Sequence, residues 1–94
     1  MPQRATVTTT IRNRLGLHAR PAMAFVDVAS RFASVVTVRR ADTPGEFVDG
    51  KSIMQMMMLA ATNGTKLEVN AEGADAEAAC EALRLLVESG FEED

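Results

Sequence analysis

The sequence predicts an α+β protein in which a four-stranded antiparallel sheet carries three helices on one face. Two observations lead to this fold. Apolar and polar residues alternate in four short stretches, and three other stretches carry apolar residues at helical spacing, in the order βαββαβα. The predicted strands are amphipathic rather than uniformly apolar, which favours an antiparallel sheet with one covered face.

The first half of the chain is expected to hold a strand at 5–11, a helix at about 19–33 and a strand at 35–40. β-Branched residues alternate in the first stretch, as in a half-buried strand. Pro21 suits the first turn of the helix, where the missing N–H breaks no intrahelical bond. The apolar stripe of that helix comprises Ala22, Phe25, Val26, Ala29, Phe32 and Ala33.

The second half is expected to begin with a turn at 42–45 and a short strand at 46–49. A short helix at 52–60 and a strand at 66–71 follow. Asp75 is expected to cap the last helix, and Gly90 suits the position just after it. The apolar stripe of the last helix comprises Ala76, Ala79, Cys80, Leu83, Leu86 and Val87.

Composition excludes several classes of protein. The 94 residues suffice for one domain, expected to span 1–94, and 47% of them are hydrophobic. A net charge of -3 and 4% aromatic residues argue against nucleic-acid binding. The single cysteine, Cys80, excludes a disulfide framework and the usual zinc ligand sets, so no metal site is expected. No cofactor is expected either. Without a signal core or a spanning stretch, we expect a cytoplasmic protein that does not insert into membranes.

The sharpest motif is Gly16-Leu17-His18-Ala19-Arg20-Pro21-Ala22, which holds the one histidine of the chain. His18 falls where a glycine loop meets a helix N-terminus, and the N–H groups there form an anion site that Arg20 strengthens. Imidazole is a usable nucleophile near neutral pH. The motif therefore indicates transfer of a phosphoryl group onto and off an imidazole nitrogen. Its alternative is structural, because a lone histidine at a helix start is more often a surface residue or a cap.

Two segments carry a family resemblance. Asn13-Arg14-Leu15-Gly16-Leu17-His18-Ala19-Arg20-Pro21-Ala22 resembles the active-site signature of HPr, the histidine-containing phosphocarriers of the bacterial phosphotransferase system. Gly50-Lys51-Ser52-Ile53-Met54 resembles the second signature of that family. The resemblance extends from Thr6 to about Val87, and it implies an open-faced β-sandwich.

The resemblance also implies a mechanism. His18 would accept a phosphoryl group on Nδ1 from phosphorylated enzyme I, which phosphoenolpyruvate charges, and pass it to an enzyme IIA for sugar uptake. Arg20 and the N–H groups of Ala19 and Arg20 would stabilise the phosphoryl group. Such a protein is a phosphoryl-transfer carrier rather than a turnover enzyme.

Ser52 and Gln55 have the spacing of a capping box at the start of the short helix. In family members from many bacteria the matching serine is phosphorylated by an ATP-dependent kinase. The resemblance thus implies regulation at Ser52, with an HPr kinase/phosphorylase and a transcriptional regulator as further partners.

The short helix is apolar on more than one side. Met56, Leu59 and Ala60 are expected to face the sheet. The other apolar face is expected to dock protein partners, because flexible thioethers adapt to several surfaces, and it comprises Ile53, Met54 and Met57.

The sequence departs from the family pattern at two places. Leu15 stands where some members carry a small polar residue that caps the active-site helix, which leaves that polar contact open. The turn at 41–46 is longer than is usual in the family.

Three other functions stay open. The NPr branch of the family takes phosphate from a different enzyme I and regulates nitrogen metabolism. A regulator acting through Ser52 is a second, although an intact His18 counts against it. A nucleotide-binding module is a third, because residues 45–52 match GxxxxGK[ST] letter for letter, but the segment is strand-like and carries two acids. This third function predicts an affinity for ATP that Lys51→Ala abolishes.

Overall fold

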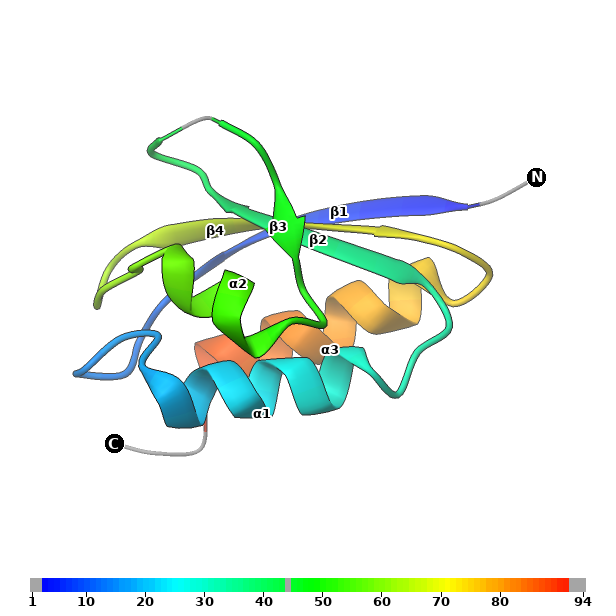
Figure 1. Ribbon diagram of the computed structural model, residues 1–94. Coiled ribbons are helices and arrows are strands. Elements are labelled where there is room, and N and C mark those ends of the chain that lie inside the picture. Colours follow the sequence, from blue (N-terminus) through cyan, green and yellow to red (C-terminus); the bar gives the residue numbers. More distant parts are fainter. Residues whose placement is uncertain (1–2, 44, 92–94) are drawn as a thin grey trace.

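A computed structural model describes residues 3–43 and 45–91. Within these residues the strands form an antiparallel sheet of order β1-β4-β2-β3. The helices all lie on one side of that sheet (Figure 1). The predicted fold class is therefore confirmed. The elements in chain order are β1 (Arg4–Thr10), α1 (Ala19–Ala29), β2 (Val35–Arg40), β3 (Val48–Asp49), α2 (Ile53–Met58), β4 (Lys66–Glu72) and α3 (Ala76–Glu88).

The alternation of β4 shows how the strands divide the sheet into two faces. Its apolar residues Leu67, Val69 and Ala71 are buried beneath the helices, as predicted. The polar residues between them belong to the opposite face, where Asn70 accepts a hydrogen bond from Thr6 at 2.9 Å. One face of the sheet therefore builds the core and the other is polar, which is the arrangement of an open-faced sandwich.

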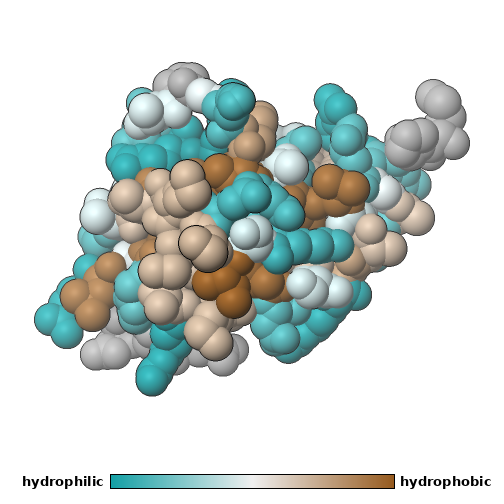
Figure 2. Space-filling view, viewed as in Figure 1, coloured by the Kyte–Doolittle hydropathy of each residue, from teal (hydrophilic) through white to brown (hydrophobic). Residues whose placement is uncertain are grey.

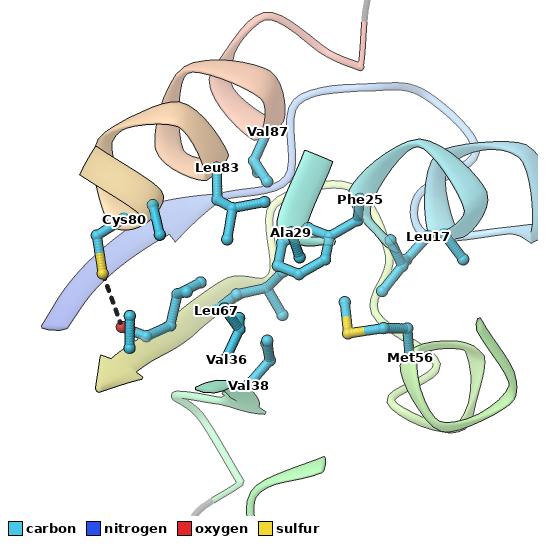
Figure 3. Packing of buried hydrophobic residues seen from close by; sticks show 14 of the residues in the cluster. Leu17, Phe25, Ala29, Val36, Val38, Met56, Leu67, Cys80, Leu83 and Val87 are labelled. Atoms are coloured by element: carbon cyan, nitrogen blue, oxygen red, sulfur yellow. Dashed lines mark hydrogen bonds between the residues drawn. The ribbon is translucent and has the colours of Figure 1, made fainter. Parts of the chain in front are cut away.

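The core lies between the sheet and the helices (Figure 3). Phe25 of α1, Leu83 of α3 and Met56 of α2 meet there, each fully buried. Cys80 also lies in the core, as expected, and its thiol contacts the Ala5 carbonyl at 3.4 Å. Burial raises the pKa of the Cys80 thiol, so the group stays protonated near neutral pH.

The helix α1 is shorter than predicted. It ends at Ala29, and the expected extension to residue 33 was wrong. Arg31 N–H and Phe32 N–H bond to carbonyls only three residues back, at 3.1 and 3.2 Å, so the chain tightens into a turn. Phe32 still packs against the core from this turn, whereas Ala33 is exposed. The apolar pattern in the sequence continues past the end of α1 because Phe32 packs against the core from a turn rather than from the helix.

Three strands also differ slightly from the prediction in their bounds, and the smallest difference is in β4, which ends at Glu72 rather than at residue 71. β1 begins one residue earlier and ends at Thr10, because Ile11 N–H bonds instead to the carbonyl of Thr65 in a loop, at 2.9 Å. β3 holds two residues rather than four, since its pairing with β2 covers only Val48 and Asp49.

The helix α2 ends at Met58, before the predicted Ala60. Ala60 has a φ of 51° and is exposed, so the expectation that it faces the sheet was wrong. Leu59 is half-buried against the core. The guanidinium of Arg40 donates to the Leu59 and Ala60 carbonyls at 3.4 and 3.3 Å, which supplies donors to the end of the helix.

Asp75 occupies the N-cap position of α3, but its side chain does not cap the helix. The carboxylate instead accepts hydrogen bonds from Ala33 N–H at 2.8 Å, from Ser34 N–H at 3.0 Å and from the Ser34 hydroxyl. The predicted position of Asp75 at the helix start is therefore confirmed, whereas the prediction that its side chain caps α3 was wrong. Asp75 ties the connection between α1 and β2 to the start of α3.

These contacts make stability depend on pH. The Ser34 hydroxyl and the Ala33 and Ser34 amides hold the pKa of Asp75 below its ordinary value of 3.8. The native state then binds the proton less readily than the unfolded state, so the stabilisation is present above that ordinary value and is lost as pH falls through the lowered pKa. Urea unfolding of Asp75→Asn from neutral pH to about pH 2 should show a deficit against wild type that shrinks in acid.

Asp27→Asn is the matched control for that experiment. The Asp27 carboxylate pairs with Arg31 on the exposed side of α1 at 2.8 Å, and exposed pairs contribute little to stability. A deficit for Asp75→Asn that stays constant with pH would show that the ionised carboxylate does not contribute the stabilisation.

Candidate functional site

His18 is the N-cap residue of α1. Its backbone is extended, with φ -81° and ψ -169°, and its carbonyl accepts the first helical bond from Ala22 N–H at 3.0 Å. The His18 side chain is half-buried and makes no capping hydrogen bond to the first turn. The predicted junction of loop and helix therefore exists, and the imidazole is not used to cap α1.

The first turn of α1 has the properties of an anion site. The amides of Ala19 and Arg20 precede the first helical bond, so helix geometry gives them no carbonyl partner within α1. Both residues are exposed, and Pro21 after them is buried and has no N–H. The positive end of the helix dipole adds to these donors. A phosphoryl group held beside His18 would therefore meet backbone donors and the charge of Arg20.

A tight turn precedes His18. Gly16 N–H donates to the Asn13 carbonyl at 3.3 Å, and the Asn13 side-chain amide donates back to the Gly16 carbonyl at 2.7 Å. Asn13 is buried, and Gly16 has a φ of 71°, in the left-handed region that favours glycine. The turn holds the chain in the path that delivers His18 to the helix start.

The turn is anchored to a second loop, at 60–65, which the sequence did not connect with it. Leu17 N–H donates to the Ala61 carbonyl at 2.9 Å. The side-chain amide of Asn63 donates to the Arg12 and Asn13 carbonyls at 3.0 and 3.2 Å. In the sequence, Asn63 and Gly64 have the residue types of a turn, which does not indicate this contact. The role of Asn63 could not be found from spacing, because its partners lie about fifty positions away.

Arg20 lies on the first turn of α1, two residues after His18, and is exposed. Arg12 and Arg14 in the preceding loop are also exposed. The region around His18 thus carries positive charge although the whole chain is acidic. Leu15 is exposed as well, and the N-cap position belongs to His18.

Ser52 is the N-cap of α2, as predicted. Its hydroxyl accepts a hydrogen bond from Gln55 N–H at 3.2 Å. The reciprocal half of the capping box is absent, because the Gln55 side chain accepts from Asp49 N–H at 2.9 Å instead. Gln55 therefore joins α2 to β3, and Ser52 alone caps the helix.

The helix α2 presents an apolar surface to solvent. Ile53, Met54 and Met57 are exposed, as expected, and Met58 is exposed beside them. Apolar residues gather over α2 on the face of the molecule seen in Figure 2. Met56 is the buried member of the helix, also as expected, and α2 packs against α1, whose N-cap is His18.

The segment that matches a nucleotide-binding motif has a structural role here. Gly50 N–H donates to the Val36 carbonyl at 2.8 Å, and a Cβ on Gly50 would lie 2.6 Å from Val36 Cγ1. The Lys51 ammonium donates to the Phe32 carbonyl at 2.8 Å. The glycine and the lysine thus join β2 and the turn after α1 to this segment. These contacts do not support nucleotide binding.

The described residues, 3–43 and 45–91, hold neither a metal-binding cluster nor a helix that could span a membrane. No group of three or more His, Cys, Asp or Glu side chains is placed to hold a metal ion within them. None of their helices has the length and apolarity that crossing a bilayer requires.

The fold and the position of His18 define a class of small open-faced sandwich proteins that carry a histidine at the N-cap of their first helix. Residues 5–89 match the family model described as the PTS HPr component phosphorylation site. The chain belongs to this family, the HPr and NPr phosphocarriers of the bacterial phosphotransferase system. The resemblance found in the sequence is thereby confirmed.

Relatives and a solved structure agree with this assignment. The chain is 50% identical over 84 residues to the phosphocarrier protein HPr of Pseudomonas aeruginosa, covering 89% of this chain and 91% of that one. It is 42% identical to the phosphocarrier protein NPr of Proteus mirabilis, with the same coverage. The crystal structure of HPr-C-His from Thermoanaerobacter tengcongensis has a TM-score of 0.86 and 43% identity, covering 96% of this chain and 98% of that one.

Proposed function

We propose that His18 carries a phosphoryl group between the proteins of a sugar phosphotransferase system. Its Nδ1 accepts the group from phosphorylated enzyme I, which phosphoenolpyruvate charges, and an enzyme IIA then takes it for sugar uptake. One observation supports this most strongly: the sole histidine occupies the N-cap of α1 beside the Ala19 and Arg20 amides. The protein acts as one domain, 1–94, in the cytoplasm.

Each transfer exchanges one nitrogen–phosphorus bond for another. The neutral imidazole nitrogen attacks phosphorus while the bond to the donor nitrogen breaks, so no cofactor is needed. Negative charge on the phosphoryl oxygens is stabilised by the Ala19 and Arg20 amides, by the dipole of α1 and by the Arg20 guanidinium. The site lies at the surface, where a partner's active site can reach it.

Partners dock on α2 in this proposal. Ile53, Met54 and Met57 form an exposed apolar surface on a helix that packs against α1. A carrier must bind a donor and several acceptors through one surface and leave each of them, and flexible methionines suit that requirement. Enzyme I and the enzyme IIA proteins are the expected partners.

The proposal is tested by the intact mass of the chain after incubation with phosphoenolpyruvate and enzyme I. We expect the mass of one phosphate, and we expect that phosphate to be lost in acid, as a phosphoramidate is. Transfer is then followed by adding an enzyme IIA, which should discharge the carrier. A mass that stays unchanged with every enzyme I tested would contradict the proposal.

The nitrogen branch is the second candidate, because an NPr protein matches the chain over the same share of its length as an HPr protein does. The rate of phosphorylation by each of the two kinds of enzyme I separates the branches. We expect the sugar enzyme I to be faster, and a faster nitrogen enzyme I would assign the chain to the regulatory branch.

Arg20→Ala is expected to slow phosphorylation of His18 by about ten- to a hundredfold, because the guanidinium is a charged donor to the phosphoryl oxygens. Arg20→Lys should recover only part of the rate, since an ammonium keeps the charge but loses the planar fork. Rapid-quench measurement of the phosphorylated fraction gives the rates. Arg31→Ala, which changes an exposed arginine in the turn after α1, is the matched control. Equal rates for Arg20→Ala and the control would remove Arg20 from the mechanism.

Regulation at Ser52 completes the proposal. An HPr kinase/phosphorylase would phosphorylate the serine that caps α2, and the modified form would bind a transcriptional regulator. The fold tolerates a phosphate at a helix N-terminus, whereas partners that dock on the neighbouring apolar surface meet new negative charge.

Two substitutions at Ser52 distinguish its role in capping α2 from the effect of a negative charge at this position. Ser52→Ala removes the hydroxyl that accepts Gln55 N–H, so we expect a loss of about 1 kcal/mol of stability with transfer unaffected. Ser52→Asp keeps a capping oxygen and adds a charge, so it should stay folded but transfer about tenfold more slowly. Thermal unfolding and phosphorylation rates check both results. Normal transfer by Ser52→Asp would contradict regulation by charge at this position.

A further inference from the structure

The four methionines of α2 differ sharply in their exposure to solvent. Met54 and Met58 are 78% and 75% exposed, and Met57 is 42% exposed. Met56, in the middle of the same helix, is 0% exposed and packs in the core (Figure 3). One short helix therefore places oxidisable thioethers both on a free surface and in a protected interior.

We infer that Met54, Met57 and Met58 form a reversible oxidation site that switches off partner docking while the fold stays intact. The inference rests on the proposed function, in which this surface of α2 receives enzyme I and the enzyme IIA proteins. It adds a redox control that acts directly on the docking side chains.

The oxidant is a peroxide, and the reaction balances without a metal or cofactor. A lone pair on Sδ attacks one peroxide oxygen, the O–O bond breaks and an S–O bond forms. The second oxygen leaves as water after taking up the proton that the first oxygen carried. Sulfur loses two electrons and the peroxide gains them. A thiol-dependent reductase reverses the change, forming a disulfide and water as the sulfoxide returns to the thioether.

Docking is lost because the sulfoxide changes the character of the surface. It replaces a flexible apolar group by a polar one, whose oxygen must give up water when a partner covers it. The core is spared, because solvent and peroxide do not reach Met56 in the folded chain. The site thus separates loss of binding from loss of structure.

The experiment treats the full chain with hydrogen peroxide and maps each methionine by peptide mass. Met54 and Met58 should be oxidised first, Met57 next and Met56 last, with the thermal midpoint nearly unchanged. Phosphorylation by phosphoenolpyruvate and enzyme I should then slow about tenfold, and methionine sulfoxide reductase should restore it. Early oxidation of Met56, or an unchanged rate despite sulfoxide at the three exposed positions, would overturn the inference.

Two variants assign the effect to α2. For the triple variant Met54→Leu, Met57→Leu and Met58→Leu, the ratio of rates before and after peroxide should be close to one, whatever its starting rate. Met23→Leu, which removes an exposed methionine of α1, should keep the sensitivity of wild type. A triple variant as sensitive as wild type would overturn the inference alone. An untreated wild type that enzyme I never phosphorylates would overturn the proposed function and the inference together.

Discussion

His18→Ala is expected to lose phosphorylation by enzyme I completely, with a rate at least about a thousandfold below that of wild type. The reason is chemical, because the nucleophilic nitrogen is removed and the chain contains no other histidine. The only cysteine is buried in the core and its thiol pKa is raised, so it does not replace the imidazole. The phosphorylated fraction is measured by intact mass at neutral pH.

The fold of His18→Ala should be nearly that of wild type. The His18 side chain makes no capping bond to the first turn of α1, so its removal takes no cap from the helix. We expect unfolding free energies within about 1 kcal/mol of each other. His18→Gln is the companion variant, since it keeps a polar side chain of similar reach without a nucleophile. An acid-labile phosphate on either variant would place the phosphoacceptor elsewhere.

Gly16→Ala is expected to damage both stability and transfer. A Cβ on Gly16 would lie 2.5 Å from the Ala61 carbonyl oxygen and 2.8 Å from Thr62 Cα, and both are backbone atoms that cannot rotate away. The left-handed φ of 71° adds strain for any residue with a Cβ. Together these effects should lower the free energy of unfolding by about 2–4 kcal/mol, as urea unfolding would measure.

The rate at which Gly16→Ala is phosphorylated should fall even when the loss of stability leaves no variant unfolded. The substitution pushes the turn at 13–16 away from the loop at 60–65, and Leu17 N–H then loses the Ala61 carbonyl. His18 follows directly after, so the imidazole moves relative to the first turn of α1. Under conditions where the variant is fully folded, phosphorylation should still be about tenfold slower than in wild type.

Gly64→Ala is the matched control for Gly16→Ala. Gly64 also has a left-handed φ, of 89°, but a Cβ there would meet no atom within 4 Å. The free energy of unfolding of Gly64→Ala should therefore fall only by the cost of the left-handed backbone, about 1 kcal/mol. The variant should be phosphorylated at the wild-type rate. Equal losses for the two variants would show that the close approach of Gly16 to Ala61 and Thr62 is not what holds the loop.

Much of the molecule could be predicted because its signals are local. The alternation in β4 and the stripe of α3 identified the elements and their buried faces, since a period of two or of 3.6 residues is written into the chain itself. The same locality placed His18 at the start of α1 and Ser52 at the start of α2. A cap or a helix start depends on the next few residues alone.

The errors occurred where a distant partner decides the structure. Asp75 had the right spacing for a cap, but the amides of Ala33 and Ser34 compete for its carboxylate across the fold. α1 ended early because Phe32 reaches the core from a turn, which periodicity alone does not distinguish from a helix. Sequence patterns over a few residues do not indicate a hydrogen-bond partner about forty positions away.

The sequence by itself determined the order of the elements, the faces they bury and the residue types at the helix starts. The tertiary structure alone decided which segments hold the His18 loop in place, through Ala61 and Asn63, and that Gly16 has no room for a side chain. The physical reason is range. Backbone geometry and side-chain periodicity act over a few residues, whereas hydrogen bonds and close packing join whichever segments the folded sheet brings together.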